Sequence, residues 1–175
     1  ATGISYNNIS GMNRSASLYA QANRRFNLDG FDEERKIKNK DLLEYSLKAT
    51  FIEPYLFYNT FGTQIEFEQS SSFQRMRFPG YDADIFRLAP QLSKAFKNWK
   101  WLSTSVRYQF ERIVQFDATN SKDNDNFSIG SITPSVALDF RDNPRKGAFF
   151  TLSSEWANSN FGSVKNDDLE VNFVK

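Results

Sequence analysis

An alternation of apolar and polar residues with a period of two runs through most of this chain. In residues 15–23, alanine or leucine occupies every second position, while serine, tyrosine, glutamine and asparagine fill the positions between them. Successive side chains of a β-strand point to opposite faces of a sheet, so this pattern predicts a strand with one apolar face. The same alternation recurs in residues 3–7, 43–51, 61–68, 86–93, 102–111, 132–141, 150–156 and 169–173. The sequence therefore predicts an all-β fold of about nine antiparallel strands.

The length of these segments favours a sheet that spans a membrane. They run for about nine to fourteen residues, whereas globular strands usually have about five or six and tilted transmembrane strands need about nine to eleven. The mean hydropathy of −0.59 does not oppose this, because only every second residue of a barrel strand must face hydrocarbon. We therefore predict a fragment of an antiparallel transmembrane β-barrel. No run of about eighteen apolar residues predicts a spanning helix, and the first twenty residues lack the basic start and apolar core of a signal peptide.

The connections between these segments are predicted to alternate strictly between short and long. The short set comprises residues 8–13, 53–59, 97–100 and 142–147, which are rich in Asn, Gly, Pro or aromatic residues. The long set is polar and charged and comprises residues 27–40, 70–84, 117–126 and 158–168. Short turns on one rim and longer loops on the other are typical of outer-membrane barrels, whose short turns face the periplasm.

Aromatic residues gather near the short turns. The chain has 18 Phe, 7 Tyr and 3 Trp, or 16% aromatic residues, and those beside the short turns suggest an aromatic girdle at a membrane interface. The residues assigned to it are Tyr55, Phe57, Tyr58, Trp99 and Trp101. The alternative is a one-sided soluble sheet in which such aromatic residues pack over a core. Pro90 and Pro134 lie within strand patterns, where they predict bulges or strand starts.

Charged residues lie in the middle of the polar pattern of several strands. We predict that they face the lumen of the barrel: Glu44, Glu66, Glu68, Arg107 and Glu111. Barrel interiors are commonly lined by mixed charges, so we expect a solvated ion-pair network rather than a general acid and base. Two carboxylates without a supporting site define no hydrolytic reaction.

The remaining composition argues against catalysis and against metal binding. With no His and no Cys, the chain offers no common nucleophile arrangement, disulfide framework or usual zinc site. Residues 117–126 resemble part of a calcium loop but lack its glycine and terminal glutamate, which favours a surface loop. The net charge of +1 comes from interspersed charges, unlike a nucleic-acid-binding surface. We expect no enzymatic activity, no cofactor, no metal and no nucleic-acid partner.

The most distinctive string is LDFRDNPRKG, residues 138–147. It predicts a strand end followed by a tight turn, because Asp, Asn, Pro and Gly stand in turn-forming positions. The residues assigned to this structural motif are Asp139, Arg141, Asp142, Pro144 and Gly147.

This string and its continuation GAFFTLSSEWANSNFGS resemble the periplasmic turn midway through the barrel of the BamA and TamA family of outer-membrane β-barrel assembly factors, the bacterial surface antigen barrel. The start GISYNNISGMNRSASLYAQANRRF is similar to the family's second strand, turn and third strand, and LKATFIEPYLFYN is similar to another strand end. The resemblance implies that residues 1–175 form part of one barrel domain, from strand two to strand ten of sixteen. The POTRA domains, the remaining strands, the lateral seam and the lumen-loop motif would lie outside this segment.

The function implied by this resemblance is insertion of β-barrel proteins into the bacterial outer membrane through a lateral seam. The implied partners are outer-membrane lipid, unfolded β-barrel precursors and accessory lipoproteins or other subunits of an assembly complex. An unpaired strand edge can act as a template for an incoming strand, so no catalytic side chain is needed. The alternatives are a TamA-like or two-partner secretion transporter or pore, and a soluble β-sandwich binding module.

Overall fold

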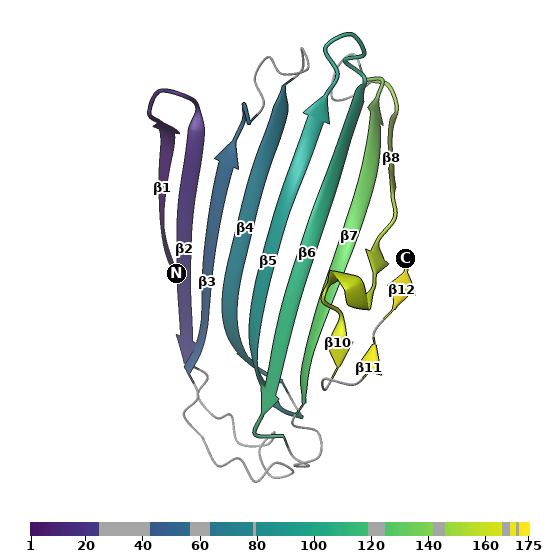
Figure 1. Cartoon of the computed structure of the whole chain (residues 1–175). Coiled ribbons are helices and arrows are strands. Elements are labelled where there is room, and N and C mark those ends of the chain that lie inside the picture. The colour runs from purple at the N-terminus through teal and green to yellow at the C-terminus, as the bar shows by residue number, and fades with distance from the viewer. Residues whose placement is uncertain are drawn as a thin grey trace.

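The chain folds into a single antiparallel sheet that remains open, and this confirms the all-β prediction (Figure 1). The computed structural model describes residues 1–24, 43–56, 64–78, 80–118, 125–141, 146–165, 169–170 and 172–175. Within these ranges, the chain has twelve strands, which all belong to one sheet, and no α-helix. No helix in this part of the chain is long and apolar enough to cross a membrane.

Seven long strands form most of the sheet in up-and-down order, each paired with the next. They are β1 (Thr2–Ile9), β2 (Arg14–Arg24), β3 (Leu43–Glu53), β4 (Ile65–Arg77), β5 (Asp82–Ala95), β6 (Leu102–Phe116) and β7 (Asn126–Asp139). Their alternation of apolar and polar residues matches the side-chain period of a strand, which explains why these segments pair.

The last part of the sheet consists of short strands along two paths. They are β8 (Phe149–Ser153), β9 (Trp156–Ala157), β10 (Val164–Lys165), β11 (Leu169–Glu170) and β12 (Phe173–Val174). The first path consists of β8, β9 and β10, which all pair with β7. The second path consists of β11, which pairs with β10, and β12, which pairs with β9. These two paths and the seven long strands match the nine expected strands in order, but β10 lies inside residues 158–168, which were wrongly predicted to be a long loop.

A polar excursion, defined as residues 158–163, interrupts the first path. It contains the 3₁₀ turn η2 (Ser159–Phe161), with Asn158 as its N-cap and Gly162 as its left-handed C-cap at φ 95°. The Tyr108 hydroxyl donates to the Phe161 carbonyl oxygen at 2.9 Å. Ser163 is fully buried, and its Oγ accepts from the Gly130 amide at 3.0 Å and donates to the Gly130 carbonyl at 2.8 Å. These bonds hold the excursion against β6 and β7.

The strict alternation of short and long connections is wrong. Residues 70–84, predicted as a long loop, belong almost entirely to β4 and β5, and only residues 78–81 connect these strands. The Phe78 amide donates to the Tyr81 carbonyl oxygen at 2.8 Å and closes this turn. The serines and glutamines of this segment suggested a loop, but cross-strand pairing outweighs their weak intrinsic preference.

The rims of the sheet therefore differ less than predicted. In Figure 1, the ends of β1 and β2, β3 and β4, β5 and β6, and β7 and β8 that follow each other in the chain lie at the upper rim, and those of β2 and β3, β4 and β5, and β6 and β7 lie at the lower rim. The strand predicted to begin at residue 61 begins at Ile65, and residues 57–63 lie outside the described part. Pro90 and Pro134 lie inside β5 and β7, where the register passes them without a shift, so the predicted bulges or strand starts are wrong.

The register sorts the side chains into an apolar face and a polar face. On β5, Phe86, Leu88, Pro90 and Leu92 belong to the apolar face, and Arg87, Gln91 and Ser93 to the polar face. Directly opposite residues share a face, so the assignment extends across the sheet. Large apolar side chains of the apolar face are highly exposed, including Ile4 at 72%, Val106 at 50% and Leu152 at 77%. Such an extensive exposed apolar surface is unusual for a monomeric soluble protein.

Candidate functional site: the polar face and the borders of the apolar face

The register places all five predicted lumen-facing charges on the polar face of the sheet. Glu66 is opposite Ser93, Glu68 is opposite Gln91, and Gln91 is opposite Arg107. Glu44 and Glu111 also share this face through their partners on β2 and β5. The period-two pattern was sufficient to choose this face.

The hydrogen-bond partners of these residues differ from the predicted network. Glu111 pairs with Arg87, whose Nε lies 2.5 Å from Glu111 Oε2 and whose Nη2 lies 3.3 Å from Oε1. Arg107 instead donates from Nε to Gln91 Oε1 at 2.9 Å. Glu44 Oε1 accepts from the Arg77 amide at 3.2 Å. The prediction missed Arg87, although the alternation places it on the polar face, because its partner depends on the register between β5 and β6.

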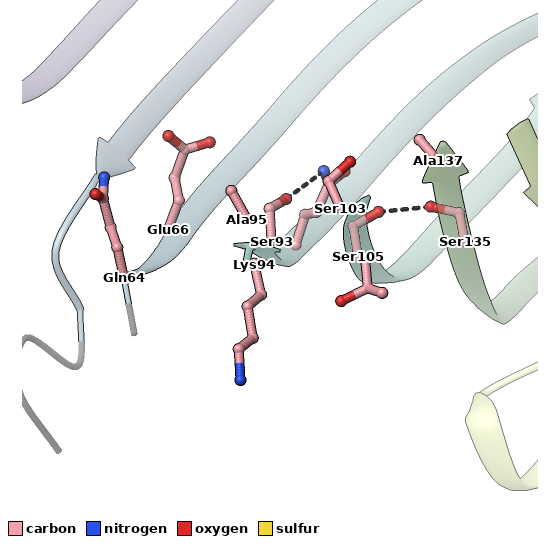
Figure 2. Close-up of a pocket in the computed structure, with 11 residues that line it drawn as sticks. Gln64, Glu66, Ser93, Lys94, Ala95, Ser103, Ser105, Ser135 and Ala137 are labelled. Atoms are coloured by element: carbon pink, nitrogen blue, oxygen red, sulfur yellow. Dashed lines mark hydrogen bonds between the residues drawn. The ribbon is translucent and has the colours of Figure 1, made fainter. Parts of the chain in front are cut away.

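A row of serines crosses the polar face in register with Glu66. The row consists of Ser93, Ser105, Ser135 and Ser153, on β5 to β8. The Oγ atoms of Ser105 and Ser135 are 2.6 Å apart, and Gln91 Nε2 donates to Ser93 Oγ at 3.0 Å. The hydroxyl groups of Ser105 and Ser135 therefore bond to each other across β6 and β7, whereas Ser93 accepts from an amide of its own strand (Figure 2).

The small side chains of this region leave a shallow hollow on the polar face. It has a volume of about 380 Å³, and its lining includes Ser93, Ser105 and Ser135 of the row together with Ala95, Ala137 and Glu66 (Figure 2). Its hydroxyl, amide and carboxylate groups can form hydrogen bonds to polar molecules. Among the described residues, the hydrogen bonds of its serines come from Gln91 and from each other rather than from Glu66, so no activated nucleophile is formed. No group of three or more His, Cys, Asp or Glu in the described residues could hold a metal ion.

The turn motif is organised by an ion pair between Asp139 and Arg141. Arg141 donates from Nε to Asp139 Oδ1 and from Nη2 to Oδ2, both at 2.7 Å. The hydrogen bond to the Asp139 carboxylate raises the pKa of the Arg141 guanidinium, which therefore stays charged. The guanidinium carbon also lies 4.8 Å from the centre of the Phe149 ring. Asp142 and Pro144 lie outside the described residues.

Gly147, the last residue of the motif, has a backbone conformation that disfavours other residues. Its φ is +119°, and a Cβ atom there would approach the Phe140 carbonyl oxygen at 2.5 Å. We expect Gly147→Ala to lower the free energy of unfolding by about 1–3 kcal/mol, measured by urea titration in detergent micelles. Gly11→Ala is the matched control, because Gly11 also has positive φ, +71°, but open space around it. Equal losses for both variants would refute a steric requirement at position 147.

Three of the predicted girdle residues lie near the upper rim. Trp99 and Trp101 stack at 6.2 Å between ring centroids, and Phe140 continues the row at 5.3 Å from Trp101. Tyr55 is 37% exposed after the end of β3. Phe57 and Tyr58 fall outside the described residues. The structure thus adds Phe140, which follows the end of β7, to the tryptophan pair that precedes β6.

Charged side chains border the apolar face toward the upper rim. Arg14 of β2 forms an ion pair with Glu53 of β3. Glu53 is level with Phe67 of β4 and Leu92 of β5 in the register. Lys94 follows Leu92 by two residues and therefore lies nearer the upper rim than the Arg14–Glu53 pair. The Lys94 ammonium lies 4.8 Å from the centre of the Phe96 ring.

A second charged border lies toward the lower rim. Arg75 of β4 and Asp84 of β5 form a bidentate pair with both N–O distances at 2.6 Å. A second pair lies two residues nearer the lower rim on each strand, where Arg77 Nε and Asp82 Oδ1 are 3.4 Å apart. Arg112 of β6 is also exposed. It lies opposite Phe86, which is two residues farther from the lower rim than Asp84. Between the two borders, β5 presents only apolar side chains on this face.

No family model, curated protein or solved structure matches the chain.

Proposed function

We propose that this sheet is part of the wall of a transmembrane β-barrel in a bacterial outer membrane. In this proposal the apolar face contacts lipid, and the polar face lines the lumen. The observation that carries it is the apolar stretch of β5 between Asp84 and Lys94, with charged residues at both of its borders.

The height of the band suits a bilayer. Asp84 and Lys94 delimit it on β5, and a separation of about ten residues corresponds to about 33 Å along a strand. A strand tilted by about 40° converts this length into a height of about 25 Å, which is the typical apolar height of outer-membrane barrels. A soluble sheet has no reason to keep this spacing.

The two borders also shift in the same direction across the sheet. Toward the upper rim, Lys94 of β5 lies one side-chain step beyond the level of Glu53 of β3. Toward the lower rim, Arg112 of β6 lies one step closer to the upper rim than Asp84 of β5. A flat membrane boundary crosses tilted strands obliquely, so it would produce such a shift at both borders.

Detergent-phase partitioning of the full-length protein tests the membrane location. We expect it to enter the detergent phase and to migrate differently in gels before and after boiling, as a folded membrane barrel does. A monomeric protein that remains in the aqueous phase would refute the barrel, because its apolar face would then be stable in water.

For the activity, we propose the insertase function that the resemblance to the BamA and TamA family implies. Its support is the order and spacing of the quoted strings, together with a polar face that lacks an activated nucleophile in the described residues. Substrate recognition would depend on backbone pairing with barrel precursors, with accessory lipoproteins as further partners. In liposomes, the protein should accelerate the folding of an unfolded outer-membrane protein. No acceleration by a correctly inserted protein would refute the insertase.

A transport pore, of the TamA-like or two-partner secretion kind, is the second candidate. The serine-lined hollow and the Arg87–Glu111 pair favour it, because polar groups of this kind can line a path for a substrate. A pore should give ion conductance in planar bilayers without accelerating the folding of barrel precursors.

A further inference from the structure

The apolar face has a distinct hollow over β1 to β4. Its volume is about 390 Å³, within the range of ligand-binding pockets. The small side chains of Ala16, Ala49 and Ser71 lie among larger neighbours and give the hollow its depth; the larger lining residues are Ile4, Tyr6, Leu18 and Phe51.

The amide donors of Gln69, at one side of this hollow, are satisfied within the protein. Gln69 Nε2 donates to the Ser70 carbonyl oxygen and to Ser71 Oγ, both at 3.1 Å. Neither hydrogen of the amide therefore needs a partner from the occupant. The rest of the lining is almost entirely apolar, which suits a hydrocarbon chain.

A cation lies directly beyond the hollow, toward the upper rim. Arg14 is the next residue after Ala16 on the same face of β2, at a distance of about 7 Å along the strand. Its Nε pairs with Glu53, which is buried, while the Arg14 side chain remains 36% exposed. A guanidinium has five N–H donors, so this ion pair leaves donors for a second anion.

We propose that this hollow holds one acyl chain of a phospholipid whose phosphate binds Arg14. This rests on the proposed membrane location. The order of the groups along the sheet matches the order in a phospholipid, because the charged residue lies at the border of the apolar band and the hollow lies immediately inside it. Arg14 supplies the positive charge that complements the phosphate.

Native mass spectrometry of the full-length protein in detergent tests this with two lipids, dioleoyl phosphatidylglycerol and dioleoylglycerol, which lacks the phosphate. Wild-type protein should retain one phosphatidylglycerol molecule, with about tenfold higher affinity than for dioleoylglycerol. Ala49→Phe should fill the hollow and reduce phosphatidylglycerol binding about tenfold. The matched control is Ala22→Phe, another exposed alanine of the apolar face that does not line the hollow, and it should leave binding unchanged.

Two results would overturn the lipid site. One is equal retention of lipid by the Ala49→Phe and Ala22→Phe variants, both shown to be folded by their heat-dependent gel mobility. The other is equal affinity for the two lipids, which would remove the role of Arg14. If the wild-type protein partitions into detergent but shows either result, only the lipid site fails. If it remains in the aqueous phase, the proposed barrel fails as well.

Discussion

Replacing Val106 with arginine should lower the free energy of unfolding in a bilayer by about 1–3 kcal/mol. Val106 lies inside the apolar band on β6, two residues from the level of Lys94 and six residues from Arg112. In the proposed barrel its side chain contacts hydrocarbon, where a guanidinium loses its hydration without gaining a partner. Reversible urea unfolding in lipid vesicles measures the loss.

The same substitution separates the membrane sheet from a soluble one. Val106 is 50% exposed, and a charged residue at such a position in water usually changes stability by no more than about 0.5 kcal/mol. Gln109→Arg is the control on the same strand, because residue 109 shares the polar face with Ser131. It should cost less than about 1 kcal/mol in the proposed barrel. Similar small effects of both variants would contradict a lipid-facing position for Val106.

Replacing Gly130 with alanine should have an effect of similar size, a loss of about 3 kcal/mol. A Cβ atom at position 130 would overlap the backbone carbonyl of Phe161, which cannot move independently of the polar excursion. The excursion would have to withdraw from β6 and β7. It would then lose the hydrogen bonds from Tyr108 to Phe161 and between Ser163 and Gly130.

Urea titration in detergent micelles tests the Gly130 prediction with Gly80→Ala as its control. A Cβ atom at position 80 would meet no atom within 4 Å, so this variant should remain within about 0.5 kcal/mol of wild type. Ser163→Ala tests the same contact with a smaller change. It should lower the free energy of unfolding by about 1–3 kcal/mol, because it removes a buried hydroxyl that bonds both the amide and the carbonyl group of Gly130. If Gly130→Ala is as stable as wild type, the excursion does not pack on β7 as described.

The interrupted path after β7 was the least predictable part of the fold. Its sequence reads as a strand followed by a loop, but the excursion depends on contacts with residues far away in the chain. Asn158 and Gly162 are a recognisable cap and turn residue, so a local turn could have been found from sequence. The need for glycine at position 130 could not, because it arises from the approach of Phe161 across the sheet.

The candidate site shows the same division. The period of two was sufficient to place Glu66, Glu68, Arg107 and Glu111 on one face, because this period is a local property of every strand. The partners of Arg107 and Glu111 were not predictable in the same way. Gln91 and Arg87 contact them only because β5 and β6 pair in one particular register.

The sequence by itself determined the strands, their two faces and the turn at Gly147, because side-chain alternation and turn preferences operate over a few residues. Only the tertiary structure decided that residues 70–84 form two strands and a tight turn, that the serines align in a row, and that charged residues border the apolar face on both sides. Each of these features depends on register between strands, and register is set by side chains on neighbouring strands that are distant in sequence.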